Sequence, residues 1–201
     1  MWNFRLPDWY NWMGQMSTVY FMENLKTLKF ERCFAVDTEL RRYLRACPGI
    51  EHFSVKGSIM QIVGPYYLPS ADPGFPSNIW GRLQSLDLSG TGRYAKLVHE
   101  QVLNDTRCPV THLFLEQCPI LPRPFPHLKI EFVSVAGYRP SPGVGNAFED
   151  IDAWASMLTM KRINASGCDL TPEQRNELVR KHPRVVFNLS EYYDESPRVE
   201  S

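Results

Sequence analysis

The sequence predicts an α/β solenoid, a fold in which short parallel strands and connecting helices alternate and stack along one axis. Three observations support this prediction. A phrase of alternating apolar residues recurs along the chain, proline stands just before several copies of it, and helical patterns lie between the copies. We expect about seven parallel strands on the concave face, with helices and proline-rich loops on the convex face.

The recurring phrase has apolar residues at its first, fourth and sixth positions and a cysteine or small polar residue at its ninth. Leu25, Leu28, Phe30 and Cys33 form the first copy. A strand with this alternation has one apolar face that it cannot bury alone, so the copies must stack to share a core. The seven copies start at Leu25, Ile50, Leu83, Val110, Ile130, Met160 and Arg184.

The spacing of the copies also fits a repeat protein. Their starts are 20 to 33 residues apart, and the pattern L-x-x-L-x-L-x-x-C/N/T has a period of about 20–29 residues in its known family. The chain therefore resembles the leucine-rich repeat family, in its intracellular cysteine-containing variety. The resemblance covers residues 25–192 and implies a leucine-rich repeat solenoid that serves as a binding surface.

Proline supports the same register independently. Pro48, Pro109 and Pro183 each come shortly before a copy of the phrase. Because proline lacks an N–H and has a fixed φ, it ends the preceding helix and begins the next strand.

The spacing of apolar residues between the phrases predicts helices. The last helix is expected to begin with Thr171 as N-cap, Pro172 in its first turn and Gln174 completing a capping box. Two proline-rich connections, residues 59–80 and 119–129, are predicted to be extended or turn-like. The expected helices are residues 37–46, 93–104, 147–158 and 171–181.

Composition favours one globular unit and argues against two classes of partner. The chain has 22 basic and 22 acidic residues, whereas nucleic-acid binding normally needs a basic stripe. No apolar run approaches the roughly 20 residues of a membrane span, although peripheral membrane contact stays open. We expect an aromatic N-terminal segment without signal-peptide features at residues 1–24, a repeat domain at 25–192 and a C-terminal tail at 193–201.

All five cysteines have a place in the repeat. Cys33, Cys118 and Cys168 occupy the ninth position of their phrases, where the side chain points into the stack, and Cys47 and Cys108 stand just before a strand. An odd number of cysteines without a C-x-x-C motif argues against a disulfide framework. This favours an intracellular, reducing compartment, either cytoplasmic or mitochondrial.

No catalytic site and no cofactor are predicted. A zinc site of His99, Cys108, His112 and Cys118 would draw its ligands from four unrelated parts of the repeat. A nucleophile–base pair of Cys118 and His112 is also unexpected, because the register directs the thiol inward and the imidazole outward. We therefore expect neither a metal nor an enzymatic activity.

The predicted partner-binding surface lies at the third, fifth and seventh positions of the phrases, which face away from the core. Phe114 and Phe132 fall on adjacent strands there, flanked by His112, Glu116 and Arg162. An exposed aromatic pair among charged residues is typical of a protein-binding hot spot. A shift of one residue in the fifth copy would instead place Phe132 in the core.

The aromatic N-terminal segment is the second candidate surface. It contains Trp2, Trp9 and Trp12, and the last two fall on one face of a predicted helix. Such a segment could cap the open apolar edge of the first repeat, or it could dock on a partner. Deleting it distinguishes these roles, because loss of a cap destabilises the fold whereas loss of a docking arm removes only the partner.

These features favour a non-catalytic protein–protein interaction module, an accessory or scaffold subunit of a larger intracellular assembly. The resemblance implies two narrower alternatives. One is the mitochondrial assembly-factor role of the ATP synthase subunit s (coupling factor B) group. The other is substrate recognition in a ubiquitin ligase, as in F-box leucine-rich repeat proteins, although an F-box needs a longer N-terminal region than residues 1–24.

Overall fold

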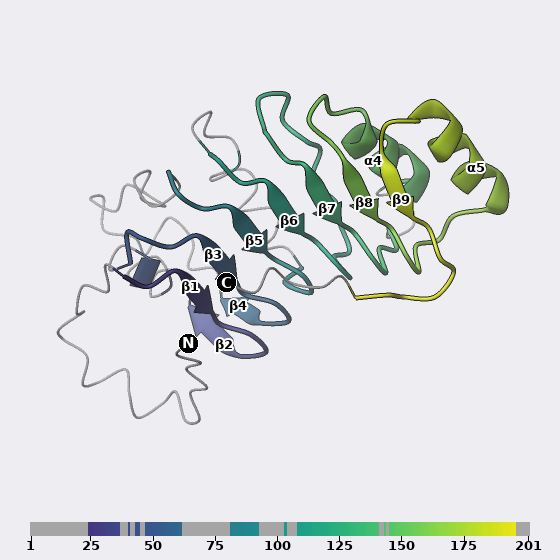
Figure 1. The fold of residues 1–201 in the computed structure, drawn as a ribbon. Helices are drawn as coiled ribbons and strands as arrows, with labels where there is room; N and C mark the ends of the chain where they lie inside the picture. The colour runs from purple at the N-terminus through teal and green to yellow at the C-terminus, as the bar shows by residue number, and fades with distance from the viewer. Residues whose placement is uncertain are drawn as a thin grey trace.

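Seven strands form one parallel sheet whose spatial order follows the chain (Figure 1). The computed structural model describes residues 24–36, 40, 43–44, 47–61, 81–92, 103, 108–140, 143 and 145–195. The strands of the sheet are β1 (Thr27–Lys29), β3 (His52–Ser54), β5 (Ser85–Asp87), β6 (His112–Phe114), β7 (Phe132–Ser134), β8 (Arg162–Asn164) and β9 (Val186–Asn188).

Each strand occupies the third to fifth residues of one predicted phrase, the fifth copy included. Neighbouring strands pair without offset, so that Thr27 is level with His52, and His52 with Ser85, as far as Val186. Pairing like positions places the fourth-position apolar residues on one face, whereas a shift of one residue would send them to the other. The prediction of an α/β fold with seven parallel strands is confirmed.

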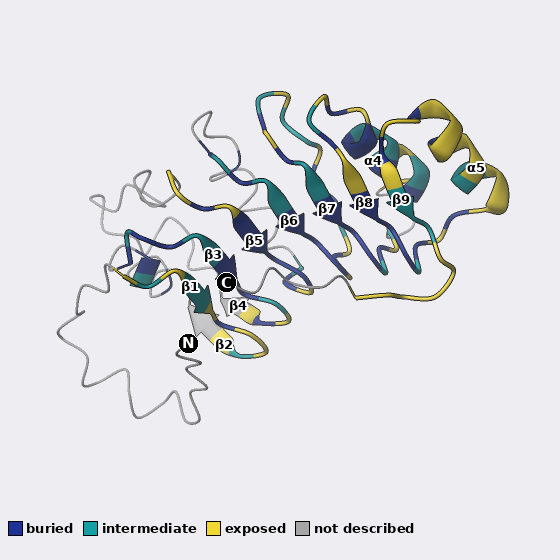
Figure 2. Ribbon diagram, in the orientation of Figure 1, coloured by how far each residue is buried: buried dark blue, intermediate teal, exposed yellow. Residues whose placement is uncertain are grey.

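The fourth and sixth positions of the phrases build the core. Leu86, Leu113 and Ile163 at fourth positions, and Leu88 and Leu115 at sixth positions, have no exposed surface. Figure 2 shows that burial is most complete in the middle strands and decreases towards β9. This gradient is expected, because a central strand has neighbours on both sides and an end strand has only one.

Helix α4 (Ala147–Ala155) covers part of this core. Its first turn is capped by Asn146, whose side chain accepts a hydrogen bond from the Phe148 amide at 3.0 Å. Ile151 and Trp154 are buried in the core, and the Trp154 indole N–H donates to the Pro122 carbonyl at 3.1 Å. The proline-rich connection 119–129 is thus fixed to the helix rather than free in solvent.

Helix α5 (Pro172–Lys181) begins with the predicted capping box. The Thr171 amide donates to the Gln174 side chain at 2.9 Å, and the Gln174 amide donates to the Thr171 hydroxyl at 3.3 Å. Within the described ranges, no helix has the length and apolar character that a membrane crossing requires. The predicted helices at 37–46 and 93–104 lie mostly outside the described residues.

A second, two-stranded parallel sheet is present that the sequence pattern does not predict. It pairs β2 (Phe34–Val36) with β4 (Ile59–Gln61), directly after the turns that close the first two phrases. The proline-rich pattern predicts residues 59–61 to be extended, but not to be paired with a second strand. The Phe34 and Ile59 side chains are both exposed.

A left-handed residue closes each of the first six strands of the large sheet. It is always the eighth residue of the phrase, and φ lies between 54° and 69°. Glycine adopts this conformation without a steric penalty, and it occupies four of the six sites. The residues are Arg32, Gly57, Gly90, Gln117, Gly137 and Gly167.

The contact between α4 and α5 gives a pH-dependent prediction. The Asp152 carboxylate bonds Lys181 Nζ at 2.6 Å and His182 Nε2 at 2.7 Å. Burial raises the pKa of Asp152, but the bonds to Lys181 and His182 lower it further, so the pKa ends below its usual range. A carboxyl with a lowered pKa stabilises the fold above its unfolded pKa of about 3.9 and loses this effect as pH falls through the folded value.

We therefore expect Asp152→Asn to lower the free energy of unfolding by about 1 kcal/mol at pH 7. The difference from the wild type should shrink as pH falls from about 4 through the lowered pKa of the folded carboxyl, below which the wild-type side chain is also neutral. Urea unfolding at pH 7 and at acidic pH measures both values. An equal difference at the two pH values would contradict the assigned role of the carboxylate.

Candidate functional site

The sheet face opposite the core carries polar side chains at the carboxyl ends of the strands. At several phrases the fifth-position side chain accepts a hydrogen bond from the seventh-position amide, as in an Asx-turn. Asp87 Oδ1 accepts from the Ser89 amide at 3.0 Å, and Asn164 Oδ1 accepts from the Ser166 amide at 3.2 Å. The polar residues therefore terminate the strands as well as form a surface.

The central part of this surface is buried, whereas the strand alternation predicts it to be exposed. We define the polar row as the buried polar side chains at the fifth and seventh positions. They are linked across strands, since the Ser134 hydroxyl donates to Glu116 Oε1 at 2.6 Å. The members of the polar row are Ser54, Asp87, Ser89, Glu116, Ser134, Asn164 and Ser166.

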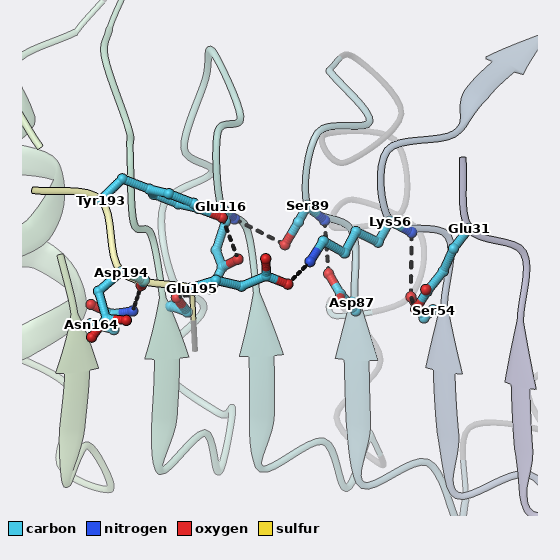
Figure 3. A network of polar contacts seen from close by, with 11 residues as sticks. Glu31, Ser54, Lys56, Asp87, Ser89, Glu116, Asn164, Tyr193, Asp194 and Glu195 are labelled. Atoms are coloured by element: carbon cyan, nitrogen blue, oxygen red, sulfur yellow. Dashed lines mark hydrogen bonds and ion pairs between the residues drawn. The ribbon is translucent and has the colours of Figure 1, made fainter. Parts of the chain in front are cut away.

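Residues 191–195, which we call the tail segment, lie across the polar row. Figure 1 shows the chain turning back after β9 and running along the carboxyl ends of the strands towards the first half of the sheet. Figure 3 shows Tyr193 bonded to Glu116 and Asp194 bonded to Asn164, both in the polar row, and Glu195 paired with Lys56. The polar face of the sheet is thus already occupied by an extended piece of the same chain.

The backbone of the tail segment is bound at Asp194. Its amide donates to Ser166 Oγ at 2.9 Å, and its carbonyl accepts from Ser166 Oγ at 3.0 Å and from Asn164 Nδ2 at 2.8 Å. The Asp194 carboxylate also accepts from Asn188 Nδ2 at 3.2 Å. The carboxyl ends of β8 and β9 thus bind both the backbone and the side chain of one residue.

Two glycines allow the tail segment to approach the sheet closely. A Cβ atom on Gly167 would lie 2.9 Å from the backbone of Tyr193, closer than side-chain carbons pack. A Cβ atom on Gly137 would lie 3.2 Å from the Tyr193 ring. Gly137 and Gly167 therefore have two roles: they adopt the left-handed conformation that the turns require, and they leave room for Tyr193.

Longer side chains extend these contacts along the sheet. The Tyr193 hydroxyl donates to Glu116 Oε2 at 3.2 Å, Lys56 pairs with Glu195, and Arg175 on α5 pairs with Glu191 at 3.1 Å. In the two ion pairs the acidic side chains are 49% and 70% exposed.

These contacts hold the tail segment with a small net free energy. Solvent-exposed ion pairs contribute about 0–1 kcal/mol each, and intramolecular hydrogen bonds about 0.5–1.5 kcal/mol. Ordering each residue of the segment costs about 1–2 kcal/mol. Because the gains and the cost are of similar size, we expect the tail segment to open without unfolding of the sheet.

The predicted aromatic hot spot lies beside the tail segment, towards the amino ends of the strands. The Phe132 ring lies 5.3 Å from Phe114 and 5.8 Å from His112 between ring centroids. Phe132 and His112 are half-buried and Arg162 is exposed, whereas Phe114 is only 1% exposed. We call His112, Phe132 and Arg162 the accessible patch.

The expected exposure of Phe114 and Glu116 was wrong. The Phe132 ring packs against the edge of Phe114, and Glu116 has the Ser134 and Tyr193 hydroxyls on its two oxygens. The alternation of side chains along a strand predicted the correct face of the sheet for both residues. It did not predict that other side chains cover this face. Their role in partner binding stays a prediction.

Two histidines on this face are neutral at physiological pH. Burial lowers the pKa of His112, and this effect outweighs the raising effect of the nearby Glu131 carboxylate. Burial also lowers the pKa of His52. The accessible patch therefore presents an uncharged imidazole, an aromatic ring and a guanidinium to a partner.

The second predicted surface is the aromatic N-terminal segment. Trp2, Trp9 and Trp12 lie outside the described residues, so both roles of the N-terminal segment stay predictions. In the part of the chain that the structure describes, no three His, Cys, Asp or Glu side chains are grouped so as to hold a metal ion.

The ninth-position side chains bond carbonyls of the sixth position. Cys118 Sγ donates to the Leu88 carbonyl at 3.4 Å, Cys168 Sγ to Val135 at 3.2 Å, and Ser58 Oγ to Phe30 at 2.5 Å. In all three the acceptor belongs to the preceding phrase, so these side chains link successive turns of the chain. All five cysteines are free thiols.

Burial gives these thiols a low reactivity. It raises the pKa of Cys118 to about 11 and that of Cys168 to about 11. Since the thiolate is the reactive form, we expect both to be alkylated at pH 8 at least about 100-fold more slowly than in the unfolded chain. Timed iodoacetamide labelling with mass spectrometry measures these rates, and half-buried Cys33 should react faster than either.

No protein-family model matches this chain, and no curated protein matches it in sequence.

Proposed function

We propose that this protein is a leucine-rich repeat solenoid that acts as a non-catalytic protein–protein interaction module within a larger assembly. The observation that carries the proposal is the sheet itself. Seven strands present their third-position side chains on one face, in register, while both described helices contribute their buried residues to the core on the other. A long, regular face of this kind suits the binding of another protein more than catalysis.

The accessible patch is the proposed point of contact. Its Phe132 ring packs against both Phe114 and His112 on the neighbouring strand, so binding would cost little side-chain entropy. Arg162 stands next to it on β8, at the same level of the sheet. A partly exposed, preorganised aromatic residue beside an arginine has the composition of protein-binding hot spots.

Quantitative affinity purification of the full-length chain tests the proposal. We expect Phe132→Ala to reduce the recovery of specifically co-purifying proteins at least about tenfold, since truncating a hot-spot residue costs about 2 kcal/mol or more of binding free energy. Leu158→Ala is the matched control, because Leu158 is an apolar side chain that is 87% exposed and lies after α4. Equal recovery with the two variants would contradict the proposed surface.

The identity of the recovered proteins distinguishes the narrower roles. Recovery of a ubiquitin-ligase adaptor would favour substrate recognition, and recovery of a mitochondrial complex would favour an assembly-factor role. Either result must depend on Phe132 to support the proposed surface.

A further inference from the structure

We propose that the polar row is a second ligand site, for an extended partner segment in which a tyrosine precedes two acidic residues, and that the tail segment occupies this site as an internal competitor. The inference rests on the proposed function, because it assigns one part of the interaction face to a class of peptide. The two proposed sites differ in location. The polar row lies at the carboxyl ends of the strands, and the accessible patch lies towards their amino ends.

The contacts of the tail segment define what the site recognises. Ser166 and Asn164 bind backbone groups of Asp194, which any residue would offer in the same place. Specificity comes from side chains: Glu116 accepts from the tyrosine hydroxyl, and Asn188 donates to the first carboxylate. The site therefore recognises a phenol followed by an acid.

Lys56 is the third side chain that recognises the ligand, after Glu116 and Asn188. It lies after β3, and its ammonium pairs with Glu195 across the strands between them (Figure 3). The Lys56 side chain is only 18% exposed, so the charge is held near the sheet rather than free in solvent. A second acidic residue in the ligand would meet this charge.

The shape of the sheet supports the same ligand. Gly137 and Gly167 leave space on two successive turns, and the Tyr193 ring and backbone fill it. Any larger residue at Gly167 would meet the backbone of the bound segment. The surface is thus complementary in shape to a peptide backbone that crosses the strands, in addition to binding its charged side chains.

The tail segment is suited to be displaced. Tyr192 is 83% exposed and Tyr193 is 41% exposed, so closure buries only part of one tyrosine ring and leaves most of the other in solvent. Polar contacts of this kind can be made equally well by another chain. An attached segment competes at an effective concentration of about the millimolar range, so a free ligand should bind much better once the attached one is weakened.

A peptide titration on the full-length chain tests this competition. The probe is a fluorescein-labelled synthetic peptide with the sequence of residues 189–196, Leu-Ser-Glu-Tyr-Tyr-Asp-Glu-Ser. The opened variant carries Tyr193→Ala, Asp194→Ala and Glu195→Ala, which change the tail segment and leave the polar row intact. By fluorescence anisotropy, we expect the peptide to bind the opened variant at least about tenfold more tightly than the wild type.

A charge exchange separates specific from non-specific binding. Lys56→Glu in the opened variant should reduce peptide affinity, and a peptide with lysine in place of Glu195 should bind this variant better than the original peptide does. Glu195→Ala alone serves as the opened form if thermal melting shows that the triple variant does not fold. Equal affinity for wild-type and opened chains, or no preference in the charge exchange, would overturn the inference.

The two proposals fail in different ways. If the peptide results are negative while Phe132→Ala still abolishes partner recovery, the polar row is only a docking place for the tail and the proposed function stands. If Phe132→Ala leaves the recovery of partners unchanged, the accessible patch is not the partner-binding surface and the proposed function is contradicted. This holds for any result of the peptide titration.

Discussion

Replacing Leu115 by alanine should lower the free energy of unfolding by about 2–5 kcal/mol, the range for truncating a buried leucine. Leu115 has no exposed surface and lies in a central phrase, with Leu88 and Val135 at the same position of the neighbouring copies. Its removal leaves a cavity that two adjacent copies line, and a tightly registered stack can close such a cavity only in part.

The control for this measurement is Lys29→Ala. Lys29 is exposed and occupies the fifth position of its phrase, one step from the core in the strand alternation. We expect this substitution to cost no more than about 0.5 kcal/mol. Urea unfolding of both variants gives the comparison. Equal losses in the free energy of unfolding would mean that the assignment of the buried and exposed faces of the sheet is wrong.

Replacing Gly167 by alanine should have the second-largest effect, and it should act in two ways. The left-handed φ of 65° costs a non-glycine residue about 1–2 kcal/mol. The new Cβ atom would also lie 2.9 Å from the backbone of Tyr193, so the tail segment must move. We expect a total cost of about 2–3 kcal/mol together with loss of the closed tail.

Gly92→Ala separates the two contributions. Gly92 has a similar φ of 59°, and no atom of the described residues lies within 4 Å of the place that its new Cβ atom would take. Hydrogen exchange at the Asp194 amide, which donates to Ser166 in the closed form, reports on the tail directly. Fast exchange in Gly167→Ala but not in Gly92→Ala is the expected result, whereas equal protection in both would contradict the close packing of the tail.

The large sheet could be predicted from the sequence because its information is local and repeated. Each phrase carries its own alternation, so an error in one copy is corrected by the others, and even the copy that begins with Arg184 has its strand at the expected residues. The capping box of α5 was predictable for the same reason, since Thr171 and Gln174 are three residues apart. The left-handed turns have a local signal as well, namely glycine at the eighth position of four phrases.

The burial of the polar row could not be predicted in this way. It depends on a contact between Glu116 and Tyr193, which are 77 residues apart. Nothing in the polar sequence around Tyr193 indicates which surface it will cover, because such a segment can remain in solvent at little cost. The pairing of β2 with β4 could not be predicted for a related reason, since Phe34 and Ile59 follow their phrases and belong to no repeated pattern.

The in-line order of the strands has a consequence for how the molecule unfolds. Each strand of the large sheet is bonded within it only to its nearest neighbours, so the stability of such a stack spreads from neighbour to neighbour, and its ends can fray independently. The contact between Lys56 and Glu195 joins residues 139 positions apart. It links the turn after β3 to the segment after β9, and so adds a direct connection, worth about 1 kcal/mol or less, between parts of the array that no strand pairing joins.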